Sequence, residues 1–325
     1  MKNTLFINFG GIGDEILFLP TIRAYKENYP DSKITLALEP RSKCICDLTD
    51  LIDETISVDI KSSKKYFNLL NFIMLCRGKK FDEVISSGKS PFIAIILFLT
   101  GIKERVGYCS KTDFLLTKSV QLNENQYAGR MYHDLLKPLG ITEYKNPQIK
   151  AEGDFEYSDF VAIHPGVSKM SILKNILKCP NPSFFQNLIK GLLNKNKKVL
   201  LLGSPDDKDI VEKILSDKEI LNHPNFINYF NKTKNIMDMA KVMKNATCVI
   251  CPDSAPMHCA TALGVKTFAL FCPTNEKKLV PENSNVEIIK NDIPCRPCLW
   301  HKRSENCDKS ECLNLDYNMI LDKIN

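Results

Sequence analysis

Short apolar runs rich in β-branched residues alternate with helical stretches along the first half of the chain. The predicted strands are residues 4–9, 33–38, 54–58, 83–86 and 105–108, and the predicted helices are residues 14–28, 66–76 and 91–99. Strands that alternate with helices form a parallel sheet with helices on both faces. This alternation restricts the chain to the α/β class more strongly than any other feature of the sequence.

The same alternation starts again after a polar stretch at residues 144–158. Predicted strands follow at 160–164, 198–202, 247–251 and 266–271, with predicted helices at 182–194, 235–244 and 256–263. A chain of 325 residues is also too long for one ordinary core. We therefore predict two Rossmann-like domains, residues 1–150 and 151–325, whose parallel sheets present the carboxyl ends of their strands to one ligand cleft.

Composition and charge exclude several classes of protein. Hydrophobic residues make up 44% and charged residues 25% of the chain, which argues against wholesale disorder. The net charge of +6 is modest and spread along the chain, so it suits phosphosugars or an acidic membrane surface rather than nucleic acid. The most apolar stretch, residues 91–99, is about half the roughly 20 residues that a membrane-crossing helix needs. We predict a cytoplasmic protein, with peripheral contact to the inner-membrane surface left open.

A glycine-rich loop, Gly10-Gly11-Ile12-Gly13, joins the first predicted strand to the first predicted helix. Glycine lets a backbone turn sharply and bring its N–H groups close to a bound group, and a helix N-terminus favours negative charge. Gly10, Gly11 and Gly13 are therefore candidates for an acceptor- or phosphate-binding loop. A simple strand-to-helix turn in which Asp14 caps the helix fits the composition equally well. The spacing does not match the G-x-G-x-x-G fingerprint of dinucleotide-binding enzymes.

The segment from Gly13 to Pro20 resembles the opening of glycosyltransferase family 9, the bacterial heptosyltransferases. In that family a Gly-Asp pair heads the first helix, a proline follows, and the aspartate is assigned as the general base. The resemblance therefore implies that Asp14 is the catalytic residue. The role is chemically sensible, because an acceptor hydroxyl that attacks an anomeric carbon must lose a proton.

A second segment, residues 253–264 continuing to Thr274, resembles the signature of the same family in the nucleotide-sugar-binding half. It contains Asp253, Ser254 and His258. A strand that ends in Asp-Ser before a helix presents hydroxyl and backbone N–H donors to a diphosphate, and Thr274 closes a second such turn. The alternative for His258 is a core histidine packed beneath the loop.

Two residues depart from the family pattern. Ala255 and Cys272 stand where the family usually has glycine, and each adds side-chain bulk where backbone should approach phosphate. Because of these departures, the alternative remains that the protein has lost its catalytic activity and only binds a nucleotide sugar.

Three further residues match positions near the donor in this family. Ser168 follows the first strand of the second domain and would supply a hydroxyl to phosphate, and Lys178 would stabilise the leaving diphosphate, with Lys169 and Lys174 as rivals. Asp207, after the next strand, would contact the nucleotide ribose. The alternatives are solvated surface lysines and an exposed acid at a helix start.

Four cysteines cluster near the C-terminus, Cys295, Cys298, Cys307 and Cys312. A C-x2-C pair with a second pair nearby is metal-ligand spacing, and four thiolates favour Zn²⁺ or a single iron. The resemblance adds that some family members that modify surface proteins carry a four-cysteine iron site. Such a metal would be structural, because four protein ligands leave no open position. Free thiols and disulfides are the alternatives.

The resemblance implies a GT-B fold, with the acceptor bound by the N-terminal domain and the nucleotide sugar by the C-terminal domain. The predicted reaction is inverting transfer of a heptose or related sugar from a nucleotide-diphosphate donor, most simply ADP-heptose, to a hydroxyl of a lipopolysaccharide core or other surface glycan. No catalytic cofactor is required. A protein acceptor and the non-catalytic binder described above are the alternatives.

Overall fold

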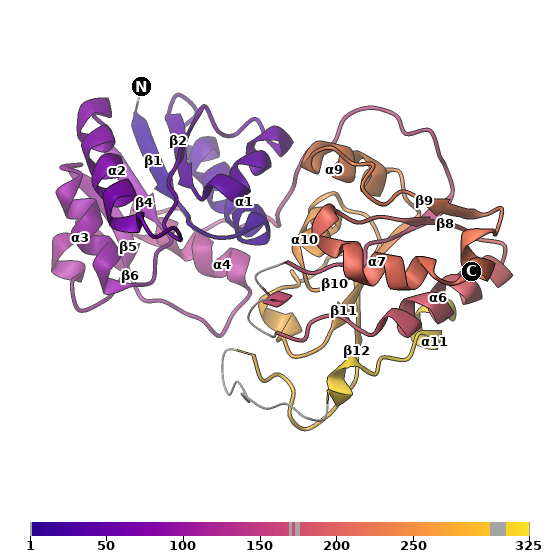
Figure 1. Cartoon of the computed structure of the whole chain (residues 1–325). Helices are drawn as coiled ribbons and strands as arrows, with labels where there is room; N and C mark the ends of the chain where they lie inside the picture. The colour runs from indigo at the N-terminus through magenta and orange to yellow at the C-terminus, as the bar shows by residue number, and fades with distance from the viewer. Residues whose placement is uncertain (1, 169–170, 173–175, 300–309, 325) are drawn as a thin grey trace. The chain divides into compact units, whose positions relative to one another are not determined.

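Two parallel six-stranded sheets form the framework of the chain, one in each of its two halves (Figure 1). The computed structural model describes residues 2–168, 171–172, 176–299 and 310–324. The chain divides into two units, Met1–Ile149 and Lys150–Asn325, and the boundary lies inside the polar stretch noted above. The binding roles predicted for the two halves stay predictions.

The sheet of the first unit has the strand order β3-β2-β1-β4-β5-β6. Its strands are β1 (Asn3–Ile7), β2 (Lys33–Leu38), β3 (Glu54–Ser57), β4 (Glu83–Ser86), β5 (Glu104–Tyr108) and β6 (Lys118–Val120). Every neighbouring pair is parallel. This is the strand order of Rossmann folds.

Helices cover both faces of this sheet (Figure 1). They are α1 (Ile12–Asn28), α2 (Lys65–Lys79), α3 (Pro91–Leu99) and α4 (Ala128–His133), with short 3-10 helices at Pro40–Leu48, Asp113–Leu115 and Asp134–Leu139. Alternate side chains of β1 pack on opposite faces, because successive residues of a strand point to opposite sides. Leu5 and Ile7 share a core cluster with residues of α2 and α3, whereas the ring of Phe6 lies 6.0 Å from that of Phe18 in α1.

The sheet of the second unit has the order β12-β11-β10-β7-β8-β9, which is the same topology. Its parallel strands are β7 (Phe160–Ile163), β8 (Lys198–Leu201), β9 (Phe226–Asn228), β10 (Cys248–Pro252), β11 (Thr267–Phe271) and β12 (Val286–Lys290). The helices are α6 (Pro182–Asn194), α7 (Lys208–Leu215), α8 (Lys218–Leu221), α9 (Ile236–Lys244), α10 (Ala255–Ala262) and α11 (Asn318–Leu321). Short 3-10 helices occur at Pro205–Asp207, Glu276–Lys278 and Glu311–Leu313. Apolar residues of β7, β8, β10, β11, α6 and α7 form one core.

The predicted α/β class with parallel sheets is confirmed, and the strands predicted from the sequence are present. Strands β6, β9 and β12 and helices α4, α7, α8 and α11 were not predicted. Helix α1 begins two residues earlier than expected, at Ile12. Within the described residues, none of the helices has the length and apolar character needed to span a bilayer. The predicted cytoplasmic location stays a prediction.

Candidate active site

Each sheet has one point at which the strand order reverses. In the first unit β1 lies beside β4, and in the second β7 lies beside β10, so that later strands add outward on both sides of each pair. In open parallel sheets, ligands bind at such a point, outside the carboxyl ends of the strands. The residues at these two switch points form the candidate site of each unit.

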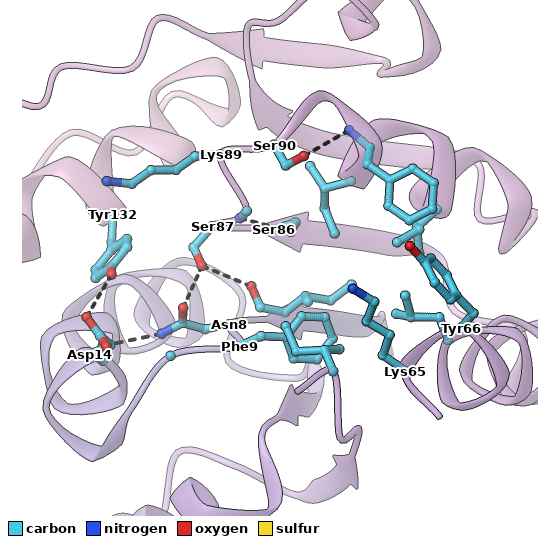
Figure 2. A pocket seen from close by; sticks show the side chains of 18 residues that line it. Asn8, Phe9, Asp14, Lys65, Tyr66, Ser86, Ser87, Lys89, Ser90 and Tyr132 are labelled. Carbon is cyan, nitrogen blue, oxygen red and sulfur yellow. Dashed lines mark hydrogen bonds between the residues drawn. The ribbon is translucent and has the colours of Figure 1, made fainter. Parts of the chain in front are cut away.

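A pocket of about 550 Å³ lies at the switch point of the first unit (Figure 2). Residues at the ends of β1 and β4 and on helices α1 to α4 line it: Ile7, Asn8, Phe9, Gly10, Asp14, Ile60, Lys65, Tyr66, Leu69, Ser86, Ser87, Gly88, Lys89, Ser90, Phe92, Ile93, Ile96 and Tyr132. Asp14 and Tyr132 lie at one end, and Tyr66 lies at the other. Hydroxyl, ammonium and carboxylate groups beside aromatic rings suit a polar ligand with several hydroxyl groups.

Asp14 presents an exposed carboxylate to this pocket. Its Oδ2 accepts a hydrogen bond from the Gly11 N–H at 2.8 Å, and the Tyr132 hydroxyl donates to Oδ1 at 3.4 Å. Gly11 is the N-cap rather than Asp14, but the Asp14 carboxylate caps the helix from the third helical position through this bond to Gly11. Two donors thus orient a carboxylate that still has acceptor capacity.

Asn8 and Ser87 hold the backbone of Asp14 in place through hydrogen bonds, and neither was identified from the sequence. The Ser87 hydroxyl donates to Asn8 Oδ1 at 2.7 Å, and the Asn8 amide donates to the backbone carbonyl of Asp14 at 3.3 Å (Figure 2). Both residues are buried. Each follows the end of a switch-point strand, and a polar residue directly after an apolar strand is the signal that would have found them.

The glycine loop acts on Asp14 through close packing. A Cβ atom added at Gly10 would lie 2.3 Å from the Cβ of Asp14, which is closer than real Cβ atoms approach. The N–H of Gly11 is used by the Asp14 carboxylate, and Gly13 lies in the first turn of α1. The loop therefore positions the carboxylate, and its contact with an acceptor or a phosphate stays a prediction.

Glu15, next to Asp14, has a buried side chain that is 1% exposed. Neither of its carboxyl oxygens has a hydrogen-bond partner within the part of the chain that the structure describes. Burial, and then the nearby charge of Asp14, raise the pKa of Glu15 well above its usual range. Glu15 is therefore a neutral acid over a wider pH range than an exposed glutamate, and no motif in the sequence indicates this.

In the second unit the structure brings two predicted donor-site residues together. The Lys178 ammonium lies 2.8 Å from Asp253 Oδ2, and the two side chains are 15% and 3% exposed. Asp253 directly follows β10, so the pair lies at the switch point. The rivals Lys169 and Lys174 lie outside the described residues.

Asp207 is a helix-start acid, but it is buried rather than exposed. Its Oδ2 accepts hydrogen bonds from the backbone N–H and the hydroxyl of Ser204, both at 2.8 Å. A Cβ at Gly166 would lie 1.7 Å from Asp207 Oδ1. His164 Nε2 lies 3.8 Å from Asp207 Oδ2. Burial lowers the pKa of His164, so this contact is not an ion pair at neutral pH. The predicted ribose contact of Asp207 stays a prediction.

The other predicted donor residues lie at the same edge of the second sheet. Ser168 is exposed after β7, with its hydroxyl 3.0 Å from that of Ser171. Ser254 is the N-cap of α10, and His258 is buried in that helix. Thr274, after β11, is fully buried, and its hydroxyl has no hydrogen-bond partner within the described residues.

The expected bulk of Cys272 at the phosphate-facing turn is not observed. Its side chain is fully buried in the core of the second unit, because it points into the apolar cluster. Ala255 is the first residue of α10 and is partly exposed. Arg296 donates to the backbone carbonyls of Cys272 and Thr274 and so holds this turn. Arg296 was not among the predicted site residues, and it reaches this turn across 22 and 24 positions of the sequence.

The cysteine cluster is only partly described, because Cys307 lies outside the described residues. Cys295 is exposed, Cys298 is half-buried and Cys312 is buried. Among the residues that the structure describes, no three His, Cys, Asp or Glu side chains gather as metal ligands. The described cysteines thus do not by themselves form the expected site, and the metal stays a prediction.

Comparisons with known proteins show which family this chain is similar to in sequence and in fold. The model of glycosyltransferase family 9 (heptosyltransferase) matches residues 70–308. Lipopolysaccharide heptosyltransferase 3 of Escherichia coli is 23% identical over 297 residues, covering 84% of each chain. The solved structure of E. coli ADP-heptose lps heptosyltransferase II has a TM-score of 0.76 at 18% identity, covering 91% of this chain and 92% of that one.

A second solved structure is similar over most of this chain. The iron-containing dodecameric glycosyltransferase TibC from enterotoxigenic E. coli has a TM-score of 0.60 at 12% identity, covering 96% of this chain and 74% of that one. The solved structures share the fold, and the predicted GT-B class with two Rossmann-like units is confirmed. Because the family model spans more than half of the sequence, the chain belongs to glycosyltransferase family 9.

Proposed function

We propose that this glycosyltransferase transfers a heptose, with inversion, from ADP-heptose to a hydroxyl of a lipopolysaccharide core. The names of its relatives, a lipopolysaccharide heptosyltransferase and an ADP-heptose heptosyltransferase, support the donor and the acceptor class. The observation that carries the proposal is the exposed carboxylate of Asp14, held by two hydrogen-bond donors at one end of a polar pocket.

Asp14 acts as the general base in this reaction. The acceptor oxygen forms a bond to the anomeric carbon of the donor while the bond from that carbon to the diphosphate breaks. The hydroxyl proton passes to the Asp14 carboxylate, and attack opposite the leaving group inverts the configuration. The Gly11 N–H and the Tyr132 hydroxyl keep the carboxylate aimed into the pocket.

The pocket of the first unit is the acceptor site in this proposal. Ser86 and Ser90 supply hydroxyl groups near the end of β4, and Tyr66 supplies an aromatic face for a sugar ring. The ammonium groups of Lys65 and Lys89 also line the pocket. This combination suits a polyhydroxylated acceptor that carries negative charge.

The switch point of the second unit is the donor site. Lys178 stabilises the charge that develops on the departing diphosphate, and Ser168, Ser254 and Thr274 supply hydroxyl groups. Asp253 holds Lys178 through the 2.8 Å ion pair, and His258 lies in the helix that Ser254 begins.

Asp207 is assigned to the nucleotide ribose. Ser204 engages its Oδ2, so Oδ1 is the acceptor for a ribose hydroxyl in this proposal.

Replacement of Asp14 tests the proposal. We expect Asp14→Asn and Asp14→Ala to lower kcat for heptose transfer by about 10²–10⁴-fold, because general-base catalysis contributes that much. ADP binding, measured by calorimetry, should be unchanged. Asp31→Asn, an exposed aspartate of the same unit outside the pocket, is the matched control. Near-normal transfer by Asp14→Asn would disprove the assigned role.

The same assay separates the two alternatives. A protein acceptor would show transfer from ADP-heptose to polypeptide and none to truncated lipopolysaccharide. A catalytically drifted binder would bind ADP-heptose without turnover on any acceptor. The ordered contacts of Asp14 favour an enzyme over a drifted binder, because a binder has no need of an oriented base.

A structural metal at the four cysteines is a second proposal, supported by the spacing and by the name of the iron-containing relative. Cys295, Cys298, Cys307 and Cys312 would supply thiolates to zinc or iron, and no catalytic step depends on the ion. Metal analysis of anaerobically purified protein should give one equivalent, reduced by Cys295→Ser. Four freely titrating thiols without bound zinc or iron would exclude it.

A further inference from the structure

Large hydrophobic side chains are exposed together on one side of the first unit. Nine of the thirteen such side chains in the described part of the chain lie on α2, α3 and the 3-10 helix Asp113–Leu115. We call them the apolar face: Tyr66, Phe67, Leu70, Met74, Leu75, Phe92, Phe98, Leu99 and Phe114. Phe114 is 78% exposed and Tyr66 is 68% exposed.

Hydrogen bonds join the three helices into one surface. Arg77 Nε of α2 donates to the backbone carbonyl of Leu99 in α3 at 2.9 Å, and the Thr112 hydroxyl donates to that of Pro91 at the start of α3 at 2.6 Å. The two long helices also run side by side in Figure 1. The three helices are therefore fixed to one another, so their exposed side chains belong to the same part of the first unit.

Helix α2 is apolar on both its inner and its outer sides. Phe72, Ile73 and Cys76 are buried in the core, while Phe67, Leu70 and Met74 point outward on the opposite side. A helix at the surface of a water-soluble domain normally has a polar outer side. Contiguous exposed apolar patches mark contact with a protein or a membrane.

The positive charge of the chain is concentrated around this face. Residues 60–115 contain ten Lys or Arg and four Asp or Glu, so their net charge of +6 equals that of the whole chain. The expectation that the charge is evenly spread is therefore wrong. Within residues 60–80 all charged residues are basic: Lys61, Lys64, Lys65, Arg77, Lys79 and Lys80. The combination of apolar side chains with surrounding ammonium and guanidinium groups is typical of a surface that rests on anionic lipid.

The apolar face borders the pocket that contains Asp14. Tyr66 and Phe92 belong to the face and also line the pocket, as do the ammonium-bearing side chains of Lys65 and Lys89 (Figure 2). A glycolipid acceptor has its sugars outside the bilayer and its acyl chains inside. A protein that lies on the bilayer through α2 and α3 would present the pocket opening at the level of those sugars.

We propose that α2, α3 and the 3-10 helix Asp113–Leu115 form a docking surface for an anionic bilayer. The aromatic and aliphatic side chains enter the interface, and the lysines and arginines contact lipid phosphates. The link to the acceptor rests on the proposed function, but binding to lipid does not require catalysis. The surface fits a bilayer better than a protein partner, because the segment that carries it, residues 60–115, has six more basic than acidic residues, and anionic headgroups attract such charge.

Vesicle flotation of the full chain tests the proposal. We expect binding to vesicles of phosphatidylcholine with phosphatidylglycerol, weaker binding to phosphatidylcholine alone, and loss of binding at high salt. The triple variant Phe67→Gln, Leu70→Gln, Met74→Gln should bind about tenfold less, because apolar burial drives interfacial binding. The charge variant Lys64→Glu, Lys80→Glu should also bind less.

The matched control is Leu221→Gln with Met319→Gln, two exposed apolar residues of the second unit. It should bind vesicles as the unchanged protein does. Equal binding by the triple variant and the unchanged protein would overturn the proposal. So would a shift from oligomer to monomer in the triple variant during sedimentation without any effect on lipid, because a second copy would then cover the face.

Two further measurements separate this proposal from the proposed function. Asp14→Asn should bind vesicles normally, because Asp14 is not part of the apolar face. The triple variant should transfer heptose to an acceptor without acyl chains at the normal rate, since its three residues do not line the pocket. Transfer to the acylated acceptor in vesicles should fall with lipid binding.

Discussion

Both units pack a carboxylate against the glycine that follows their first strand, and they use it differently. A Cβ at Gly10 would meet Asp14 at 2.3 Å, and a Cβ at Gly166 would meet Asp207 at 1.7 Å. Asp14 is exposed to a pocket, whereas Asp207 is 6% exposed and bound by Ser204. The two acids come from different places in the fold, because Asp14 lies in the helix after β1 and Asp207 follows β8, and the carboxylate is exposed in the first unit and buried in a turn in the second.

The largest expected change in stability concerns the ion pair between Lys178 and Asp253 at the switch point of the second unit. Lys178→Met leaves the carboxylate of Asp253, which is 3% exposed, without its cation. Removal of one partner of a buried pair costs about 3–5 kcal/mol, and we expect about 3 kcal/mol because Lys178 is partly exposed. Denaturant unfolding measures this change, and calorimetry should show weaker ADP binding.

Two variants serve as controls for that change. Lys208→Met removes a lysine whose partner Glu212 is exposed, and it should cost less than about 1 kcal/mol. The double variant Lys178→Met, Asp253→Asn should recover stability without recovering ADP binding. If Lys178→Met unfolded at the same denaturant concentration as the unchanged protein, the buried pair would not stabilise the second unit.

Gly10→Ala should lower both activity and stability in the first unit. The added methyl group overlaps the Cβ of Asp14, which is fixed to the backbone of α1, so the first turn of that helix must shift, and a misplacement of about 1 Å can lower the rate about 100-fold. The melting temperature should fall as well, because rotation of the Asp14 side chain does not relieve the overlap. Steady-state kinetics and a thermal melt measure both effects. Gly78→Ala, where an added Cβ meets nothing within 4 Å, is the control and should retain full activity.

Gly166→Ala should lower the stability of the second unit. The methyl group overlaps the buried Asp207 carboxylate, and overpacking of this kind costs about 1–3 kcal/mol of unfolding free energy. Chemical denaturation measures the loss. The double variant Gly166→Ala, Asp207→Ala should regain part of it, since the overlapping carboxylate is absent. An unchanged unfolding midpoint for Gly166→Ala would mean that the turn can shift freely.

The sequence was sufficient to predict the central strands of both sheets and insufficient for three of the edge strands. Strands β1, β4, β7 and β10 are buried on both faces, so their apolar runs are strong signals. The unpredicted strands β6, β9 and β12 all lie at sheet edges. Edge strands are short and carry polar side chains, because one side of each faces away from the sheet.

The residues of the candidate site that lie in family motifs could be predicted from the sequence, but their contacts could not. Asp14, Lys178 and Asp253 follow from resemblance, but the pairing of Lys178 with Asp253 does not, because 75 positions separate them. Tyr132 reaches Asp14 across 118 positions, and Ser87 reaches Asn8 across 79. No local pattern records such contacts, since they arise only when the helices and strands pack together.

The smallest expected effect concerns Glu15, a buried acid without hydrogen-bond donors among the described residues, whereas Ser204 donates two hydrogen bonds to Asp207, the buried acid of the second unit. Burial raises the pKa of Glu15 above its ordinary value of 4.5, so the folded state holds a proton that the unfolded state releases. The free energy of unfolding therefore falls as pH rises above about 4.5, by up to 1.4 kcal/mol for each unit by which folding raises the pKa. Glu15→Gln should remove this dependence and become the more stable protein toward pH 8. Glu27→Gln, an exposed change in the same helix, should keep it, and parallel pH profiles for Glu15→Gln and the unchanged protein would mean that Glu15 ionises normally in the folded state.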